Sequence, residues 1–179
     1  MRYKRFFQPG GTFFFTVVTY NRQVIFSDEP TIKILWDAVD YVKNRHPFEI
    51  FCYSILSDHL HMIWILPEGD SDYPMRWRLI KSHFTRHWKN GRRLPVSTSR
   101  QKKKEQGVWQ RRYWEHTIQD DKDLVRHVEY IHYNPVKHQL VSSPNDWHHS
   151  SFHDFVKNGF YSKDWGLDNF RDFKPFSCE

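Results

Sequence analysis

Cysteine is scarce in this sequence. Only Cys52 and Cys178 occur among 179 residues, and they lie far apart, with no spacing that is typical of metal ligands. We therefore expect neither a disulfide scaffold nor a cysteine zinc site, and a reducing compartment is the simpler location for the chain.

Long apolar runs are also missing. The longest of them, such as Met62 to Leu66, fall far short of the roughly 20 residues that span a bilayer. The residues that follow Met1 form no apolar stretch of the signal-peptide type. We therefore expect a soluble, unprocessed protein without a membrane partner.

Acidic residues are outnumbered, because 21 Asp and Glu stand against 27 Lys and Arg, a net charge of +6. Aromatic residues make up 18% of the chain and could fill a core or stack on bases. The hydrophobic share of 39% and the charged share of 27% exclude a wholly disordered or fibrous chain. This balance favours a polyanionic partner, nucleic acid before a membrane surface, and a cytoplasmic, nucleoid-associated location.

The hydrophobic pattern predicts a mixture of strands and helices. Residues 12–20 are aromatic and β-branched and follow two glycines, which is typical of a buried strand. In chain order we predict a strand at 12–20, a helix from 27 to near 47, strands at 48–56 and 59–66, a helix at 73–88, a strand at 113–118 and a helix from 120 to 135. The first six elements match β-α-β-β-α-β, the ferredoxin-like arrangement of an α+β fold.

Two segments lack this periodicity. Residues 90–107 carry six basic side chains against the single acid Glu105, which predicts a flexible basic loop. Residues 142–179 are polar and aromatic, with one possible short helix near 152–156. We therefore predict a domain at 1–141, which includes the basic loop, and a C-terminal tail at 142–179.

A candidate site combines a strand with a helix. His59 and His61 are two apart on a predicted strand, so both imidazoles face the same side and could share a metal ion. Tyr130 and Asn134 are four apart on a predicted helix, so they share one helix face. Each residue alone is more often structural, and a chain with 12 histidines contains chance pairs. Together they predict a metal site beside a nucleophile.

The same residues carry a resemblance to a known family. His59-Leu60-His61 has the His-hydrophobe-His form of the HUH single-tyrosine transposases. The stretch WQRRYWEHTI at 109–118, followed by YIHYNPVK at 130–137, resembles the REP-associated tyrosine transposases in particular. The similarity runs from about Arg5 to Val141, which is most of the chain.

This resemblance implies a ferredoxin-like fold with an additional C-terminal helix that carries the nucleophile. It implies His59, His61 and Asn134 as metal ligands and Tyr130 as the nucleophile. The substrate it implies is single-stranded DNA with a REP-type hairpin. A monomer is expected, with a homodimer as the alternative, because insertion-sequence relatives exchange helices between two subunits.

The chemistry of this set suits transesterification of DNA. Mg²⁺ or Mn²⁺ held by two imidazoles and an amide oxygen keeps open positions for phosphate oxygens. In-line attack by Tyr130 would give a 5′-phosphotyrosine and a free 3′-hydroxyl, the products expected of the family, without ATP. A tyrosine is protonated at pH 7, so the metal or a nearby base must assist, and His127 is a candidate.

Basic side chains of the predicted helix at 73–88 and of residues 90–107 are predicted to hold the hairpin stem through phosphate contacts, and the two arginines at 111–112 could also contact phosphates. We predict that the DNA-binding residues are Arg76, Arg78, Lys81, Arg86, Arg100, Lys102, Lys103, Lys104, Arg111 and Arg112. A solvated, mobile loop is the alternative for the charges of residues 90–107.

Two other functions remain open at this stage. The first is a non-catalytic hairpin-binding module in which Trp77, Phe84 and Trp88 stack on bases. The second is a zinc hydrolase, which would need Asp58 or Glu115 as a base near the metal.

Overall fold

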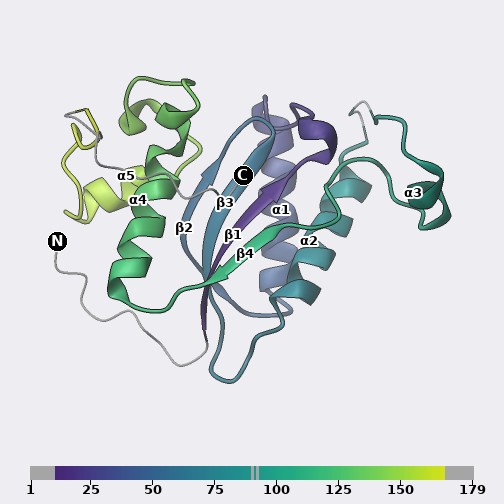
Figure 1. Ribbon diagram of the computed structural model, residues 1–179, viewed down its shortest axis with the longest axis horizontal. Coiled ribbons are helices and arrows are strands. Elements are labelled where there is room, and N and C mark those ends of the chain that lie inside the picture. Colours follow the sequence, from purple (N-terminus) through teal and green to yellow (C-terminus); the bar gives the residue numbers. More distant parts are fainter. Residues whose placement is uncertain (1–10, 90, 92, 168–179) are drawn as a thin grey trace.

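A four-stranded antiparallel sheet forms the centre of the molecule (Figure 1). The computed structural model describes residues 11–89, 91 and 93–167. The strands are β1 (Thr12–Val18), β2 (Glu49–Ile55), β3 (His59–Ile65) and β4 (Trp114–Thr117). β1 pairs with β3 and β4, and β3 also pairs with β2, so the sheet has the order β2-β3-β1-β4.

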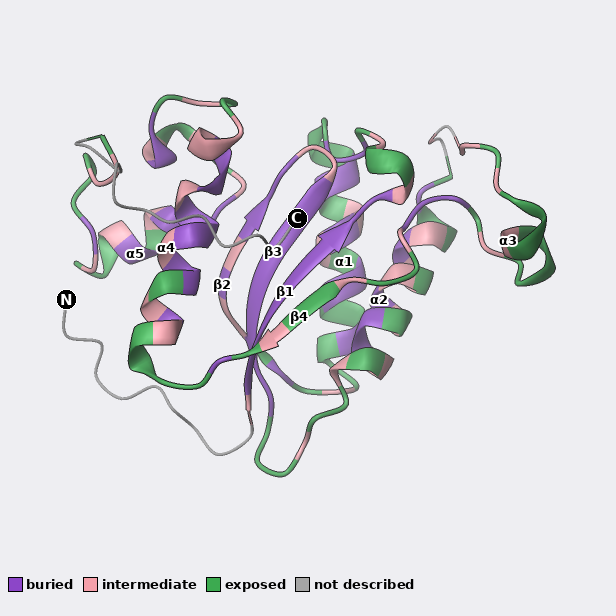
Figure 2. Ribbon diagram, in the orientation of Figure 1, coloured by how far each residue is buried: buried purple, intermediate pink, exposed green. Residues whose placement is uncertain are grey.

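Helices cover both faces of this sheet. They are α1 (Glu29–Lys43), α2 (Tyr73–His87), α3 (Thr98–Lys102), α4 (Asp121–Lys137) and α5 (Phe152–Lys157), with 3-10 turns at Tyr20–Arg22 and Pro144–Asp146. α1 and α2 pack on one face and α4 and α5 on the other, while α3 lies at one end of the molecule (Figure 1). Figure 2 shows that β1 and β3 are buried throughout, whereas β4 is a mostly exposed edge strand. No helix in the described ranges is long and apolar enough to cross a membrane.

Aspartate side chains cap the three long helices α1, α2 and α4. The side chain of Asp28 accepts a hydrogen bond from the backbone N–H of Thr31, with Pro30 in the first turn of α1. Asp72 and Asp120 cap α2 and α4 in the same way. Such caps satisfy backbone donors that have no partner inside the helix, which is why acidic residues mark these starts.

Two predicted boundaries are wrong. α4 does not end at Pro135 but continues to Lys137, because the proline removes only its own N–H donor, and the N–H of His138 still bonds to the carbonyl of Asn134 at 3.0 Å. The segment 90–107 is also not wholly irregular, since α3 forms within it. Residues 90 and 92 lie outside the described part.

The core under α1 and α2 is built from aromatic rings. Trp64 on β3 stacks on Trp77 of α2 with ring centroids 4.2 Å apart. Trp77, Phe84 and Trp88 are 1%, 0% and 7% exposed. The three rings therefore stabilise the fold and are not available to stack on bases, so the stacking predicted for the binding-module alternative is wrong.

The core under α4 and α5 includes the C-terminal segment. Phe14, Ile63 and Ile131 pack there with Phe152 of α5, which confirms the short helix predicted near 152–156. The backbone N–H of Ser151 bonds to the carbonyl of Tyr53 at 3.0 Å, so this segment is held against the edge of β2. The division into a domain at 1–141 and a tail at 142–179 stays a prediction, and Cys178 lies outside the described residues.

Candidate active site

The histidine pair lies on the face of β3 that α4 covers. His59 and His61 are 1% and 0% exposed, and their ring centroids are 5.0 Å apart. The register of the sheet places Thr16 of β1 directly opposite His61. Thr16 Oγ1 and His61 Nδ1 are hydrogen-bonded at 2.9 Å, which fixes the ring and directs Nε2 away from β1.

Asp58 orients the second imidazole. Its Oδ1 lies 2.6 Å from His59 Nδ1, and Arg22 Nη1 donates to its Oδ2 at 3.3 Å. Burial opposes ionisation of Asp58, but the interactions with His59 and Arg22 outweigh it, so the pKa of Asp58 is lowered. A carboxylate at Nδ1 favours the tautomer with its proton there, which leaves the lone pair on His59 Nε2.

α4 brings its residues against this pair. Tyr130, Asn134 and His138 follow at intervals of four, so they lie along one helix face. The ring of Tyr130 is 5.2 Å from that of His61, and the ring of His138 is 5.0 Å from that of His59. Asn134 lies between these two contacts along the helix and therefore faces the histidine pair.

The buried polar atoms at this point fit a metal ion. Within the described part of the chain, His59 Nε2 and both Oδ1 and Nδ2 of Asn134 are buried without a hydrogen-bond partner. A buried amide that makes no hydrogen bond is costly, so it marks a place where a ligand belongs. Two imidazole nitrogens and an amide oxygen are donors that Mn²⁺ and Mg²⁺ accept. All four residues predicted for the site, His59, His61, Tyr130 and Asn134, are thus brought together.

A second group that could hold a metal ion lies on the same sheet face. His116 of β4 and Asp123 and His127 of α4 place their donor atoms within 4.8 Å of one another. The sequence interpretation singled out only His127, as a possible base. The signal it missed is the spacing of four between Asp123 and His127, with a histidine on the strand that leads into their helix.

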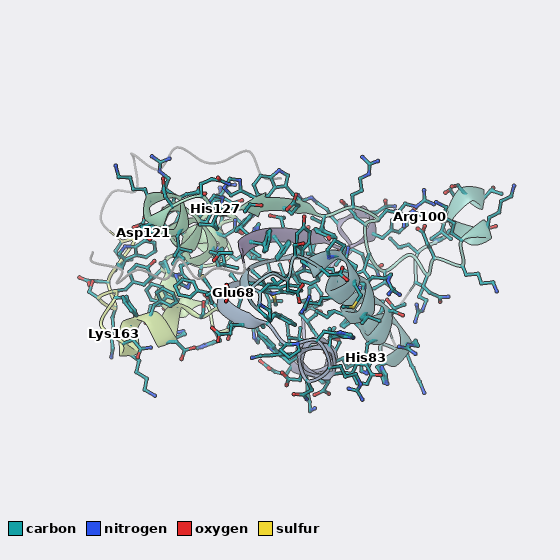
Figure 3. The ribbon with its side chains drawn as sticks, turned by 90° about the horizontal axis from the view of Figure 1, so that it is seen from below. Glu68, His83, Arg100, Asp121, His127 and Lys163 are labelled. Carbon is teal, nitrogen blue, oxygen red and sulfur yellow. The ribbon has the colours of Figure 1, made fainter. Side chains whose placement is uncertain are left out.

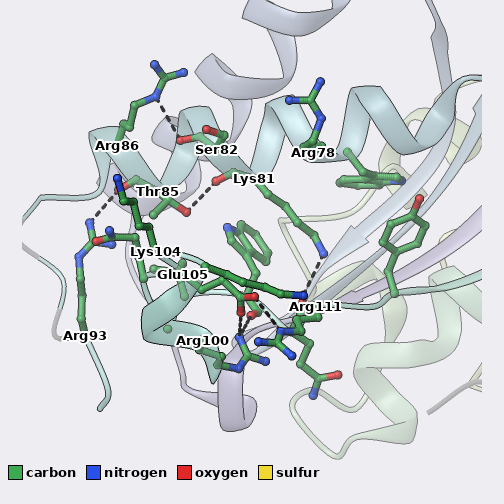
Figure 4. A pocket seen from close by; sticks show the side chains of 18 of the residues that line it. Arg78, Lys81, Ser82, Thr85, Arg86, Arg93, Arg100, Lys104, Glu105 and Arg111 are labelled. Carbon is green, nitrogen blue, oxygen red and sulfur yellow. Dashed lines mark hydrogen bonds and ion pairs between the residues drawn. The ribbon is translucent and has the colours of Figure 1, made fainter. Parts of the chain in front are cut away.

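The predicted DNA-binding residues gather mostly in one pocket of ≈ 780 Å³ on the other side of the sheet (Figure 4). This basic pocket lies between α2 and residues 93–113. The predicted residues that line it are Arg78, Lys81, Arg86, Arg100, Lys103, Lys104 and Arg111. Arg93 also lines it and was not among the predicted contacts. Lys102 and Arg112 are exposed but do not line it.

Arg76 has a different role from the predicted one. It is 2% exposed, and its guanidinium donates to both carboxylate oxygens of Asp70, at 3.1 and 2.6 Å. It also donates to the backbone carbonyls of His46, Pro47 and Asp72. Arg76 therefore joins the start of α2 to the residues that follow α1 and cannot contact phosphate without losing these bonds.

Lys81 is a half-buried cation that lines the basic pocket. Its Nζ donates to the carbonyl of Gln110 at 3.2 Å and lies 5.1 Å from the centre of the Tyr113 ring. Burial lowers the pKa of Lys81 to about 8. Glu105 forms ion pairs with Arg100 and Arg111, so these two arginines are already partly neutralised.

The two carboxylates named for a hydrolase, Asp58 and Glu115, have other partners in the structure. Asp58 is held by His59 and Arg22, as described above. Glu115 follows Trp114 and precedes His116 on β4, so strand alternation directs it to the face opposite the histidine pair, where it bonds to Tyr73.

Comparisons with known proteins show which family the chain resembles. The chain matches no family model. A protein of Haemophilus influenzae that is classed as a REP-associated tyrosine transposase is 43% identical over 164 residues, covering 92% of this chain and 92% of the relative. The REP-associated tyrosine transposase of Escherichia coli is 41% identical over 170 residues, covering 93% and 91%.

A solved structure of a REP-associated tyrosine transposase bound to a REP hairpin is also similar. It matches with a TM-score of 0.76 and 38% identity, covering 99% of this chain and 96% of that one. This chain belongs to the family of REP-associated tyrosine transposases.

Proposed function

We propose that this chain is a metal-dependent endonuclease and strand transferase for single-stranded DNA, which acts through a 5′-phosphotyrosine on Tyr130. The observation that carries the proposal is the buried set of donors, His59 Nε2 and Asn134 Oδ1 with His61 beside them, next to the ring of Tyr130. Bound Mg²⁺ or Mn²⁺ would supply Lewis-acid stabilisation of the charge that develops on the phosphate.

The residues of the chain would then perform an exchange of one phosphodiester for another. The hydroxyl of Tyr130 gives up its proton as its oxygen forms a bond to the phosphorus, the bond from phosphorus to the 3′-oxygen breaks, and the leaving 3′-oxygen takes up a proton to become a free hydroxyl. His61 and Phe14 hold the Tyr130 ring, with centroids 5.2 and 6.0 Å away, so the attacking oxygen is kept in place before DNA binds.

We also infer that the fold is ferredoxin-like. The elements β1, α1, β2, β3, α2 and β4 follow the order β-α-β-β-α-β, with α3 inserted, and the sheet order β2-β3-β1-β4 supports a ferredoxin-like topology. α4 is then the additional helix that carries the nucleophile. Because one chain supplies all four site residues, a monomer is the proposed active form.

For the substrate we propose DNA with a REP-type hairpin, since the solved relative binds a REP hairpin. The hairpin stem would lie in the basic pocket and the single strand would pass over the edge strand β4 to Tyr130. Arg100 and His127 lie toward opposite ends of the molecule (Figure 3), so one DNA molecule would have to cross this edge. Trp114 of β4 is 38% exposed there and offers a ring for base stacking.

The experiment that tests the function is detection of a covalent adduct. The chain is incubated with Mg²⁺ and single-stranded hairpin oligonucleotides labelled at either end, and the products are separated on a denaturing gel. Attack by Tyr130 leaves the label of the 3′ fragment on the protein and releases the 5′ fragment with a free 3′-hydroxyl. Release of both fragments without any adduct would favour hydrolysis and contradict the proposal.

The orienting role of Asp58 leads to a prediction on metal affinity. Asp58→Asn keeps the size of the side chain but removes the charge that holds the proton on His59 Nδ1. Loss of such a partner typically weakens a metal site about 10- to 100-fold. We expect the Mg²⁺ concentration for half-maximal cleavage to rise by that factor, with maximal cleavage partly retained. The measurement is a Mg²⁺ titration of cleavage, with Asp37→Asn on the exposed face of α1 as the control.

The basic pocket leads to a prediction on salt dependence. Each phosphate contact releases counterions, so its loss should reduce the slope of log affinity against log salt by about 0.7 to 0.9. In the triple variant, Arg78, Arg86 and Lys103 are each replaced by glutamine. We expect this variant to lose up to about three such contacts while it cleaves the DNA at the same position. The matched control replaces three basic residues of α1 and its end, Lys33, Lys43 and Arg45. Equal slopes for the two triple variants would show that the pocket does not hold DNA.

A further inference from the structure

The group formed by His116, Asp123 and His127 is distinct from the histidine pair of β3. The ring of His127 packs against the ring of Phe14, with centroids 4.8 Å apart. The ring of His116 stacks on the ring of His127, with centroids 4.6 Å apart. In the proposed nuclease site the metal-binding atoms come from β3 and the C-terminal half of α4. In this second group they come from β4 and the first two turns of α4. The two groups share no residue.

The carboxylate of Asp123 lies between the two imidazoles. Its Oδ2 is 2.7 Å from His116 Nε2, and its Oδ1 is 3.1 Å from His127 Nδ1. The backbone N–H of Gln119 also donates to Oδ2 at 2.9 Å, which fixes the carboxylate from the side of the loop. Three side chains that could bind a metal ion are thus already held close together, by hydrogen bonds within the folded chain.

The surroundings of the group leave room for entry and for further ligands. His127 is 1% exposed, but the side chains of His116 and Asp123 are 31% and 17% exposed. A cation could therefore reach the group from solvent and complete its coordination with water. Burial opposes ionisation of Asp123, but the bonds from His116 and Gln119 outweigh it, so the pKa of Asp123 is lowered and the carboxylate stays charged at neutral pH.

We propose that His116, Asp123 and His127 form a second metal site, suited to Zn²⁺, which joins β4 to the first turns of α4. Two imidazoles and one carboxylate are a donor set that Zn²⁺ binds in proteins, with a further position left for water. The bound ion would replace the hydrogen bonds of Asp123 with coordinate bonds and fix the helix that carries Tyr130 to the edge strand. This proposal does not depend on the proposed nuclease activity.

Metal content measured by equilibrium dialysis tests the proposal. The full chain is dialysed against buffered Zn²⁺ in excess Mg²⁺. We expect two ions per wild-type chain, one in His59→Ala/His61→Ala, one in His116→Gln/Asp123→Asn, and none when the four substitutions are combined. His46→Gln, which changes a histidine outside both groups, should keep two.

A second measurement guards against loss of metal through misfolding. Co²⁺ added to His59→Ala/His61→Ala should give visible absorption bands, and the further single substitution His116→Gln, at a partly exposed position on the edge strand, should remove them. Saturating Zn²⁺ should also raise the unfolding temperature of His59→Ala/His61→Ala by about 5 °C. Circular dichroism verifies that each variant is folded.

The two proposals fail in different ways. If folded His59→Ala/His61→Ala binds no Zn²⁺ or Co²⁺, the second group is a hydrogen-bonded cluster only, and this proposal is wrong. If metal bound to that variant persists after His116→Gln/Asp123→Asn, the ion lies elsewhere, which also overturns the assignment. If instead wild-type binds one Zn²⁺ that His116→Gln/Asp123→Asn loses, the second site stands, and the site at His59 and His61 does not hold Zn²⁺ under these conditions.

Discussion

Tyr130→Phe is expected to abolish cleavage of single-stranded hairpin DNA while binding of that DNA stays nearly unchanged. The substitution removes only the attacking oxygen, and the ring that packs between His61 and Phe14 remains. Removal of a nucleophile from a catalytic unit typically lowers the rate about 10⁴- to 10⁶-fold. Cleavage is measured with end-labelled oligonucleotides and binding by gel shift on the same samples.

Tyr133→Phe provides the matched control for this prediction. Tyr133 is on the same helix but lies about 60° around the axis from Tyr130 and about 100° from Asn134, so it is off the face that these two residues share. We expect its cleavage rate to stay close to that of the wild type. Peptide mapping of a trapped adduct identifies the modified residue, and DNA attached to Tyr133, or to no tyrosine, would contradict the assignment.

The elements and the positions of the four proposed site residues could be predicted because they follow local rules. Strand alternation puts His59 and His61 on one face, and helix spacing does the same for Tyr130 and Asn134. The family resemblance implies that the two pairs meet across the interface between β3 and α4. The rings of His61 and Tyr130, with centroids 5.2 Å apart, agree with this expectation.

The residues around the site depend on tertiary structure and could not be predicted in that way. Thr16 supports His61 because β1 pairs with β3 in one register, and a shift by one residue would direct its side chain to the other face. His116 meets Asp123 and His127 because β4 joins the sheet beside β1 and α4 returns over it.

Charge in the sequence also does not show which cations face solvent. Arg76 and Arg78 are two residues apart on α2, and both were predicted to contact DNA. Helix geometry separates them by about 200° around the axis. Arg76 is thereby buried against Asp70 and the carbonyls that follow α1, while Arg78 lines the basic pocket.

Removal of the metal site should have the second large effect. His61→Ala eliminates one imidazole donor of the proposed nuclease site, and we expect cleavage in Mg²⁺ to fall about a thousandfold, corresponding to about 4 kcal/mol of transition-state stabilisation. Higher Mn²⁺ should restore part of the activity, because Mn²⁺ binds nitrogen donors more tightly than Mg²⁺. The measurement is cleavage by His61→Ala and the wild type across Mg²⁺ and Mn²⁺ titrations, with EDTA as the zero point.

His132→Ala is the control that separates lost metal from lost packing. His132 is also fully buried and is also on α4, but its ring bonds to Ser151 Oγ at 2.9 Å in the core beneath α5. Burial lowers the pKa of His132 to about 3, so it is a neutral part of that core. Its loss should lower the unfolding temperature, while the folded fraction keeps the Mg²⁺ dependence of the wild type.

The metal assignment is contradicted if His59→Ala/His61→Ala cleaves at the wild-type rate in EDTA. The chemistry would then need no metal ion at these histidines, and Asn134 would have no role as a metal ligand.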